Sequence, residues 1–247
     1  MRSVRILGVR VDDVTMGEAL RHAQEMATRG GAHQIVTVNP EFVMRAQSDA
    51  TFRQVLDEAE LSIPDGQGLL WAARVVGSPL RERVAGSDMA PALAALSAQH
   101  GYRLYLLGAA PGVAEQAADV LRERYPGVQI VGTYAGSPSP AEEDEIVARI
   151  VAVRPDLLFV AYGAPAQDLW IHRNQPKMQV PVAMGIGGTL DFVAGVRKRA
   201  PVWMRRVGLE WLYRLLQEPS RWRRMLALPR FAVRVAECKF TGGRNAS

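Results

Sequence analysis

Asp65 is the residue of this sequence that is best placed to act as a general base. It follows a short apolar segment, Leu61 to Ile63, and precedes a glycine, so its carboxylate would face a ligand at the end of a strand. Pro-Asp-Gly is also a common turn and helix cap, which taken alone is the more frequent role of such a triplet. Thr37 and Asn39 end another strand candidate, although Thr37 also suits an ordinary strand position and Asn39 a helix N-cap. A functional role for these residues is favoured over a structural one because the three side chains would meet at one edge of one sheet.

A second feature is the glycine-rich segment Gly185-Ile-Gly187-Gly188-Thr189, which reads as a turn from a strand into a helix. The N–H groups of such a turn can bind a diphosphate at the helix N-terminus, and a plain tight turn explains the segment equally well. The dinucleotide fingerprint is incomplete because Leu190 stands where its third glycine belongs. The P-loop pattern is also missing, so neither a dehydrogenase nor an ATP or GTP hydrolase is supported.

Arg81 and Arg83 come just before Ala85 to Asp88, where a loop leads into a predicted helix. A guanidinium group is a rigid bidentate donor, so either arginine could bind a phosphate group. A solvated surface pair is an equally good interpretation of the two residues.

Nothing in the sequence predicts a metal or a cofactor. The acidic run Glu142 to Glu145 falls in the first turn of a predicted helix, where carboxylates complement the helix dipole. An Asp-x-Asp triplet, the usual holder of Mg²⁺ or Mn²⁺ against a nucleotide diphosphate, does not occur. The single cysteine, Cys238, cannot form an internal disulfide. The four histidines are scattered along the chain, at His22, His33, His100 and His172.

The elements that would position these residues alternate between strands and helices. Strands are predicted at Gln34 to Val38, Leu61 to Ile63, Arg103 to Leu107, Gln129 to Val131, Leu157 to Ala161 and Val180 to Met184. Helices are predicted at about 41 to 58, 67 to 76, 88 to 99, 112 to 124, 140 to 152, 166 to 174 and 189 to 194. Residues 4 to 11 are expected to form a strand or hairpin, and a capping box at Thr15 to Glu18 predicts a helix that runs to Gly30. This pattern predicts an α/β fold, a Rossmann-like mostly parallel sheet with helices on both faces, and a small helical C-terminal appendage.

Charge divides the chain into two parts that we expect to be a catalytic domain, residues 1–195, and a basic appendage, residues 196–247. Residues 1–196 contain 17 of the 30 Lys and Arg residues and 22 of the 25 Asp and Glu residues. The rest of the chain therefore has 13 basic and 3 acidic residues. Such an excess of positive charge favours binding to a polyanion, either nucleic acid or an anionic membrane surface. No apolar run approaches the roughly 18 residues that a membrane-spanning helix needs, and no signal peptide is evident.

The appendage has the composition of an interfacial membrane anchor. Three of the five tryptophans, Trp203, Trp211 and Trp222, lie among its arginines, and leucines from Leu209 to Leu216 form an apolar stripe. Indole rings sit at the level of lipid headgroups, and guanidinium groups meet their phosphates. A proline ends this helix, and a second amphipathic stretch, which we expect to kink at Pro229, follows through residue 240.

Several short motifs follow one another along the chain in a fixed order. They are Thr37-Val-Asn39-Pro-Glu41, Ile63-Pro-Asp65-Gly66, Arg83-Val-Ala-Gly86-Ser-Asp88, Leu106-Leu-Gly108, Gly163-Ala-Pro-Ala-Gln167, Gly185-Ile-Gly187-Gly188-Thr189-Leu-Asp191-Phe192 and the tail from Ala200 to Arg224. Each motif is weak alone, but their ordered combination is specific. With it, the chain resembles the WecG/TagA/CpsF family of glycosyltransferases from its first strand to about residue 237. Asp168 departs from the pattern, because the family usually has glutamate there.

The resemblance implies an inverting, metal-independent transfer of an N-acetylmannosamine-type sugar from a UDP donor to undecaprenyl-diphosphate-GlcNAc. It makes Asp65 the base, with Thr37, Asn39, Arg83 and Gln167 around the reacting groups. It assigns UDP binding to Gly136, Gly185, Gly187, Gly188 and Asp191. It assigns the acceptor diphosphate to Arg214, Arg221 and Arg224.

The expected partners are therefore a UDP-sugar donor, a polyprenyl-diphosphate-linked GlcNAc acceptor and an anionic membrane surface, with no nucleic acid, metal or cofactor. The protein would lie in the cytoplasm, peripheral on the inner face of the cell membrane. Two alternatives stay open: a nucleic-acid-binding protein that uses the basic tail, and another nucleotide-dependent enzyme on a similar sheet. Also open are the exact donor sugar, the surface polymer that it serves and the formation of a homo-oligomer.

Overall fold

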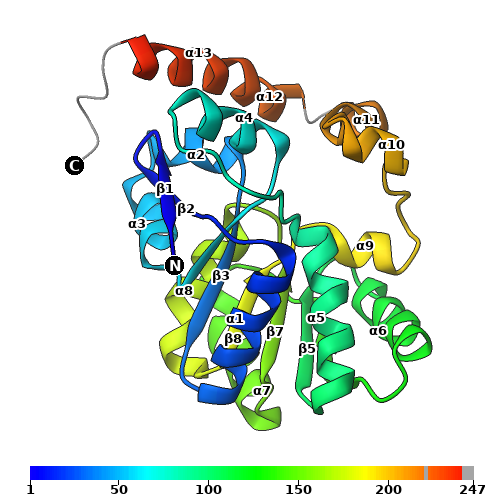
Figure 1. Ribbon diagram of the computed structural model, residues 1–247. Coiled ribbons are helices and arrows are strands. Elements are labelled where there is room, and N and C mark those ends of the chain that lie inside the picture. Colours follow the sequence, from blue (N-terminus) through cyan, green and yellow to red (C-terminus); the bar gives the residue numbers. More distant parts are fainter. Residues whose placement is uncertain (220–221, 241–247) are drawn as a thin grey trace.

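The computed structural model describes residues 1–219 and 222–240, and its centre is one parallel sheet (Figure 1). The sheet has six strands in the order β4-β3-β8-β7-β5-β6. Their bounds are β3 His33–Val38, β4 Leu61–Pro64, β5 Arg103–Gly108, β6 Gln129–Tyr134, β7 Leu157–Ala161 and β8 Val182–Gly185. The predicted parallel α/β sheet is confirmed, with differences only at the ends of strands.

Helices cover both faces of the sheet, as the alternating pattern predicted. One face buries α1 (Met16–Arg29), α5 (Gly86–His100), α6 (Val113–Arg124) and the short α9 (Thr189–Val193) in one apolar cluster. The other face carries α7 (Glu143–Val153) and α8 (Ala166–Met178), and, toward β3 and β4, α2 (Pro40–Ala46), α3 (Ala50–Glu58) and α4 (Gln67–Val75). A one-turn 3-10 helix, η1 (Pro140–Glu142), precedes α7. An inner strand such as β7 is apolar on both faces because both are buried, whereas the edge strand β6 is partly exposed.

Local signals in the sequence set several boundaries. The hairpin β1 (Ser3–Ile6) and β2 (Val9–Asp12) turns at Leu7 and Gly8, both with positive φ, which suits the twist of a tight hairpin. The capping box at Thr15 and Glu18 is present at the start of α1. The helix predicted over 41 to 58 is in fact two helices, because Asp49 accepts the Phe52 N–H at 3.0 Å and so caps α3.

The C-terminal segment crosses the carboxyl ends of the strands as four helices (Figure 1). They are α10 (Val202–Arg206), α11 (Glu210–Gln217), α12 (Trp222–Met225) and α13 (Ala227–Phe240). The expected kink at Pro229 is instead a break at Leu226, which leaves Pro229 in the first turn of α13. A proline there needs no N–H partner and disfavours helix in the turn before it.

The C-terminal segment also shares a core with the rest of the chain. Phe231 and Val235 of α13 are buried in the same cluster as Phe42 of α2 and Leu69 of α4. The division at residue 195 therefore follows charge more closely than packing, and it stays a prediction. Within residues 1–219 and 222–240, none of the helices combines the length and the hydropathy that crossing a bilayer requires.

Candidate active site

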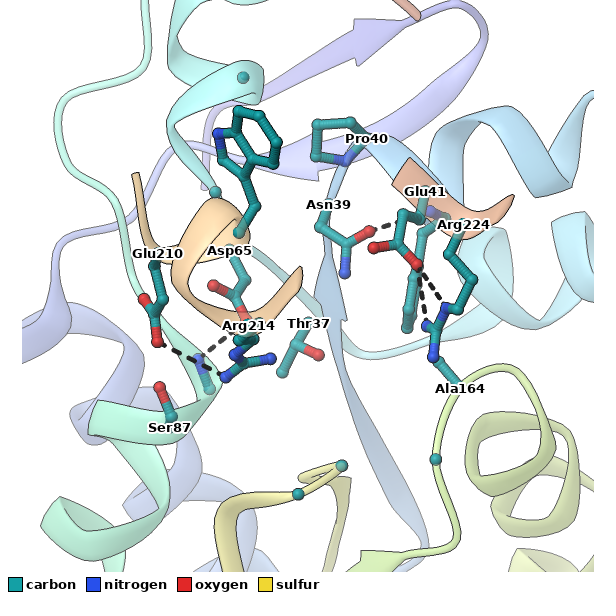
Figure 2. A pocket seen from close by; sticks show the side chains of 18 of the residues that line it. Thr37, Asn39, Pro40, Glu41, Asp65, Ser87, Ala164, Glu210, Arg214 and Arg224 are labelled. Atoms are coloured by element: carbon teal, nitrogen blue, oxygen red, sulfur yellow. Dashed lines mark hydrogen bonds and ion pairs between the residues drawn. The ribbon is translucent and has the colours of Figure 1, made fainter. Parts of the chain in front are cut away.

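A cavity of about 340 Å³ lies at the carboxyl ends of β3, β4 and β8, under α11 and α12. Its walls come from seven segments that are far apart in the sequence, because the parallel strands end side by side. The predicted site residues that line it are Thr37, Asn39, Asp65, Arg83, Gln167, Gly185, Gly187, Gly188, Arg214 and Arg224. Figure 2 shows how several of these side chains converge.

Asp65 lies at the floor of the cavity, directly after β4. Its backbone N–H donates to the Val38 carbonyl at 2.7 Å, and its carboxylate accepts the Gly86 N–H at 3.2 Å. Burial raises the pKa of the Asp65 carboxyl to about 6, although the charge of Arg83 and the Gly86 hydrogen bond act to lower it. A carboxylate with such a pKa is ionised at neutral pH and more basic than an exposed one, as a general base requires.

Gly86 is what allows Thr37 and Asp65 to lie together. A Cβ atom at residue 86 would come within 2.7 Å of the Thr37 Cγ2 atom and 3.6 Å of the Asp65 Oδ2 atom. Thr37 is itself buried, so it has little space to move away. The sequence pattern contained this glycine, but only the structure shows why a larger residue does not fit.

We expect Gly86→Ala to lower turnover about 10- to 100-fold, because displacing reacting groups by a fraction of an ångström to one ångström disturbs productive geometry. The initial rate of the catalysed reaction and a thermal melt measure this together. Gly17→Ala is the matched control, since no described atom outside its own helix lies within 4 Å of a Cβ at that position. Equal rates for the two variants would contradict the close-approach argument.

Asn39 has the capping role that the sequence left open. Its Oδ1 atom accepts the Phe42 N–H at 3.0 Å, which begins α2. The amide nitrogen is turned toward the cavity (Figure 2). The cap therefore fixes the side chain and leaves a donor for a ligand, so the two interpretations of Asn39 are compatible.

The two arginines before α5 have different places. The Arg81 guanidinium binds Glu18 and Asp13, outside the cavity. Arg83 lines the cavity with 16% of its side chain exposed, and it lies 3.4 Å from Glu210. For Arg83, the interpretation as a solvated surface residue is wrong.

Gln167 holds the glycine-rich turn in place. Its Oε1 atom accepts the Gly187 N–H at 2.9 Å, and its Nε2 atom would lie 2.5 Å from a Cβ at Gly185. The Ile186 N–H is bound to the Val160 carbonyl, and the Thr189 N–H to the Ile186 carbonyl. Three N–H groups of the turn therefore already donate hydrogen bonds within the protein. Diphosphate binding by the turn stays a prediction, and it would require the other polar atoms of the turn.

Two predicted UDP-binding residues lie outside the cavity lining. Gly136 follows β6, at the edge of the sheet opposite β4, and Asp191 on α9 lies 3.8 Å from Arg197. Their proposed roles require a ligand that extends from the cavity along the carboxyl ends of the strands.

The C-terminal segment supplies cationic side chains to the cavity. Arg214 lies 3.5 Å from Glu210 and stacks over the Phe192 ring at 5.1 Å. Arg224 binds Glu41 at 2.8 Å across the other side of the cavity (Figure 2). Arg221, the third predicted acceptor arginine, lies outside the described residues.

Comparison with known proteins decides the family. The chain matches the glycosyl transferase WecG/TagA/CpsF family over residues 4–245. It belongs to this family. Relatives named N-acetylglucosaminyldiphosphoundecaprenol N-acetyl-beta-D-mannosaminyltransferase are similar: one from Bacillus spizizenii is 37% identical over 81% of this chain and 77% of its own length. Proteins of the same name from Bacillus subtilis and Staphylococcus aureus are 36% identical over 81% of this chain and 78% of theirs, and 31% identical over 96% and 93%.

Glu210, Trp211 and Glu41 line the cavity of this WecG/TagA/CpsF protein but were not among the predicted site residues. The sequence signal that could have identified Glu210 is its negative charge in a basic segment, because only three acidic residues follow residue 196. Within the described ranges, no group of three or more His, Cys, Asp or Glu side chains is arranged to hold a metal ion. Metal independence stays a prediction.

Asp168, the residue that departs from the family pattern, is fully buried beneath the glycine-rich turn. Its Oδ1 atom would lie 2.8 Å from a Cβ at Gly185. Burial raises the pKa of its carboxyl from 3.8 to about 7, which the neighbouring Gln167 amide only partly offsets. Between pH 4 and 7 the native state keeps a proton that the unfolded chain releases, so the free energy of unfolding falls as pH rises.

We expect Asp168→Asn to be more stable than the parent at pH 8, by up to about 4 kcal/mol, and to lose most of this advantage at pH 4.5. Urea unfolding at the two pH values measures the difference. Asp119→Asn, at a side chain that is 72% exposed and lies past the first turn of its helix, is the control and should change neither midpoint. An Asp168→Asn effect that does not depend on pH would contradict a buried titrating carboxyl.

Proposed function

We propose that this protein transfers an N-acetylmannosamine-type sugar from a UDP donor to a GlcNAc residue on undecaprenyl diphosphate, with inversion and without a metal. Family membership and the names of the relatives support the sugar and the acceptor. The observation that carries the chemistry is Asp65, a partly buried carboxyl with a raised pKa of about 6 that faces a cavity lined by arginines.

In this proposal Asp65 accepts the proton of the acceptor hydroxyl as that oxygen attacks the anomeric carbon of the donor. The bond from the anomeric carbon to the UDP oxygen breaks, and UDP leaves with the electron pair. A single displacement of this kind inverts the anomeric configuration. Negative charge develops on the leaving diphosphate, and preorganised cationic donors stabilise it most effectively.

Among the described residues, the cationic side chains that line the cavity are Arg83, Arg214 and Arg224. We assign Arg83, which comes from the body of the protein, to the charge near the reacting sugars. Arg214 and Arg224 come from the helices beneath which a membrane-anchored acceptor would enter, and we assign them to its diphosphate. Helices α10 to α12 expose Trp203, Trp211 and Trp222 beside these arginines, which suits peripheral binding to an anionic membrane on the cytoplasmic side.

Transfer activity should persist in excess EDTA, because arginines rather than a divalent ion would neutralise the leaving diphosphate. The rate is measured with EDTA and then with added Mg²⁺ or Mn²⁺. A loss of turnover in the chelator that either ion restores would contradict this part of the proposal.

A panel of donors tests the function. UDP-N-acetylmannosamine, the corresponding uronic acid and UDP-N-acetylglucosamine are each offered with a short-chain lipid-diphosphate-GlcNAc acceptor, and the products are identified by mass. Transfer from the N-acetylmannosamine donor is expected. Transfer from none of the three, with a folded protein, would contradict the proposal.

A further inference from the structure

Glu210 is an acidic residue in a strongly basic segment, and it faces the cavity. It is the first residue of α11, it lines the cavity wall, and only 14% of its side chain is exposed. A carboxylate beside the proposed diphosphate site would repel the ligand unless it has another function there. Nothing in the proposed reaction uses this group directly.

Three guanidinium groups from three different segments surround the Glu210 carboxylate. Arg83 lies before α5 and is 3.4 Å away, and Arg214 lies one turn further along α11 at 3.5 Å. Arg199, at 3.5 Å, is held more closely by Asp88, at 2.6 and 3.0 Å. Glu210 therefore lies between Arg83 and Arg214, two of the three described arginines that line the cavity.

The charges of Arg83, Arg214 and Glu210 also act on Asp65. Arg83 and Arg214 lower the pKa of the Asp65 carboxyl, whereas Glu210 raises it. Two arginines without a counter-charge would hold Asp65 ionised and would weaken it as a base. A carboxylate that neutralises part of their charge keeps Asp65 basic and leaves both guanidinium groups at the cavity wall.

We propose that Glu210 is a positioning residue, which holds Arg83 and Arg214 side by side and limits the effect of their charge on Asp65. The part that concerns catalysis rests on the proposed function. The electrostatic part does not, because the coupling between Glu210 and Asp65 exists without a substrate.

A double-mutant cycle in stability tests this coupling without any ligand. Thermal unfolding is measured at pH 8 and pH 5 for the parent, Asp65→Asn, Glu210→Gln and the double variant. At pH 8, Asp65→Asn should raise the Tm of the parent protein. In the Glu210→Gln background the same replacement should raise Tm by less than half as much, because the ionised Asp65 carboxylate is no longer repelled by a charged Glu210. At pH 5, where Asp65 is mostly protonated, the two increments should converge.

Equal increments in both backgrounds at pH 8 would overturn the proposal. The cycle is repeated with Glu210→Ala, so that one variant that fails to fold leaves the other. Loss of folding in both would also overturn it, in favour of a purely structural role for Glu210.

The transfer assay then separates the two proposals. Glu210→Gln should move the acid limb of the rate profile to lower pH and reduce the plateau rate about 10-fold. Glu218→Gln, at the end of the same helix and paired with Arg197 outside the cavity lining, should leave the profile unchanged. A parent protein without transfer activity contradicts the proposed function but leaves the stability cycle valid, whereas an active Glu210→Gln variant with an unshifted acid limb overturns the role of Glu210.

Discussion

Replacing Asp65 with asparagine is expected to lower the transfer rate 10²- to 10⁴-fold and, at the same time, to stabilise the protein at pH 8. The rate falls because the amide has the shape of the carboxyl but accepts no proton, and a general base contributes about this factor. Stability rises because the native state no longer contains a partly buried carboxylate whose pKa is raised to about 6. The gain should be about 1 to 3 kcal/mol and should vanish at low pH.

Initial rates and urea unfolding at pH 5 and 8 measure both effects in the same protein samples. Asp119→Asn, at a side chain that is 72% exposed, controls for the loss of one carboxylate. A variant that keeps more than about a third of the parent rate would contradict the assignment of Asp65 as the base. A simultaneous loss of rate and of stability would indicate damage to the fold instead.

The double replacement of Arg214 and Arg224 by glutamine should lower turnover on the lipid-linked acceptor at least about 100-fold. Hydrogen bonds to charged groups contribute about 1.5 to 3 kcal/mol each, and this change removes two guanidinium groups from the cavity lining. Binding to anionic vesicles should fall much less, because each basic residue near such a surface contributes about 1 kcal/mol and many others remain.

Arg230 and Arg234 give a control of identical charge. Both are exposed on α13 and neither lines the cavity, so replacing them by glutamine removes the same net charge from the same segment. Vesicle sedimentation should fall equally for the two double variants, while turnover per bound molecule falls only for Arg214 and Arg224. Equal losses of turnover would show that these two arginines act through the membrane surface alone.

The parts of the site that depend on strand ends could be predicted from the sequence. Apolar strands that are buried on both faces can be recognised in the sequence. Because the carboxyl ends of parallel strands meet at one edge of the sheet, Asp65, Thr37 and Asn39 could be grouped without coordinates. The cap at Asn39 was also readable, because asparagine before proline has a defined local role. These inferences need only neighbouring residues and a general rule of topology.

Contacts between distant segments could not be predicted in this way. Arg81 and Arg83 are two residues apart, and their roles differ because Arg81 pairs with Glu18 on α1 whereas Arg83 faces Glu210 on α11. The internal use of the glycine-turn amides depends on Gln167, 20 residues earlier. Burial of Phe231 depends on α2 and α4, which no periodicity within α13 reveals.

The pH dependence of kcat/KM for sugar transfer tests the central claim most directly, because it reports the ionisation of the essential base in the free enzyme. With the donor and the lipid-diphosphate-GlcNAc acceptor, we predict a rate that is constant above pH 7 and falls with a slope of one below about pH 6, the pKa to which burial raises Asp65. A rate that stays constant down to pH 4.5 would contradict catalysis by this carboxylate.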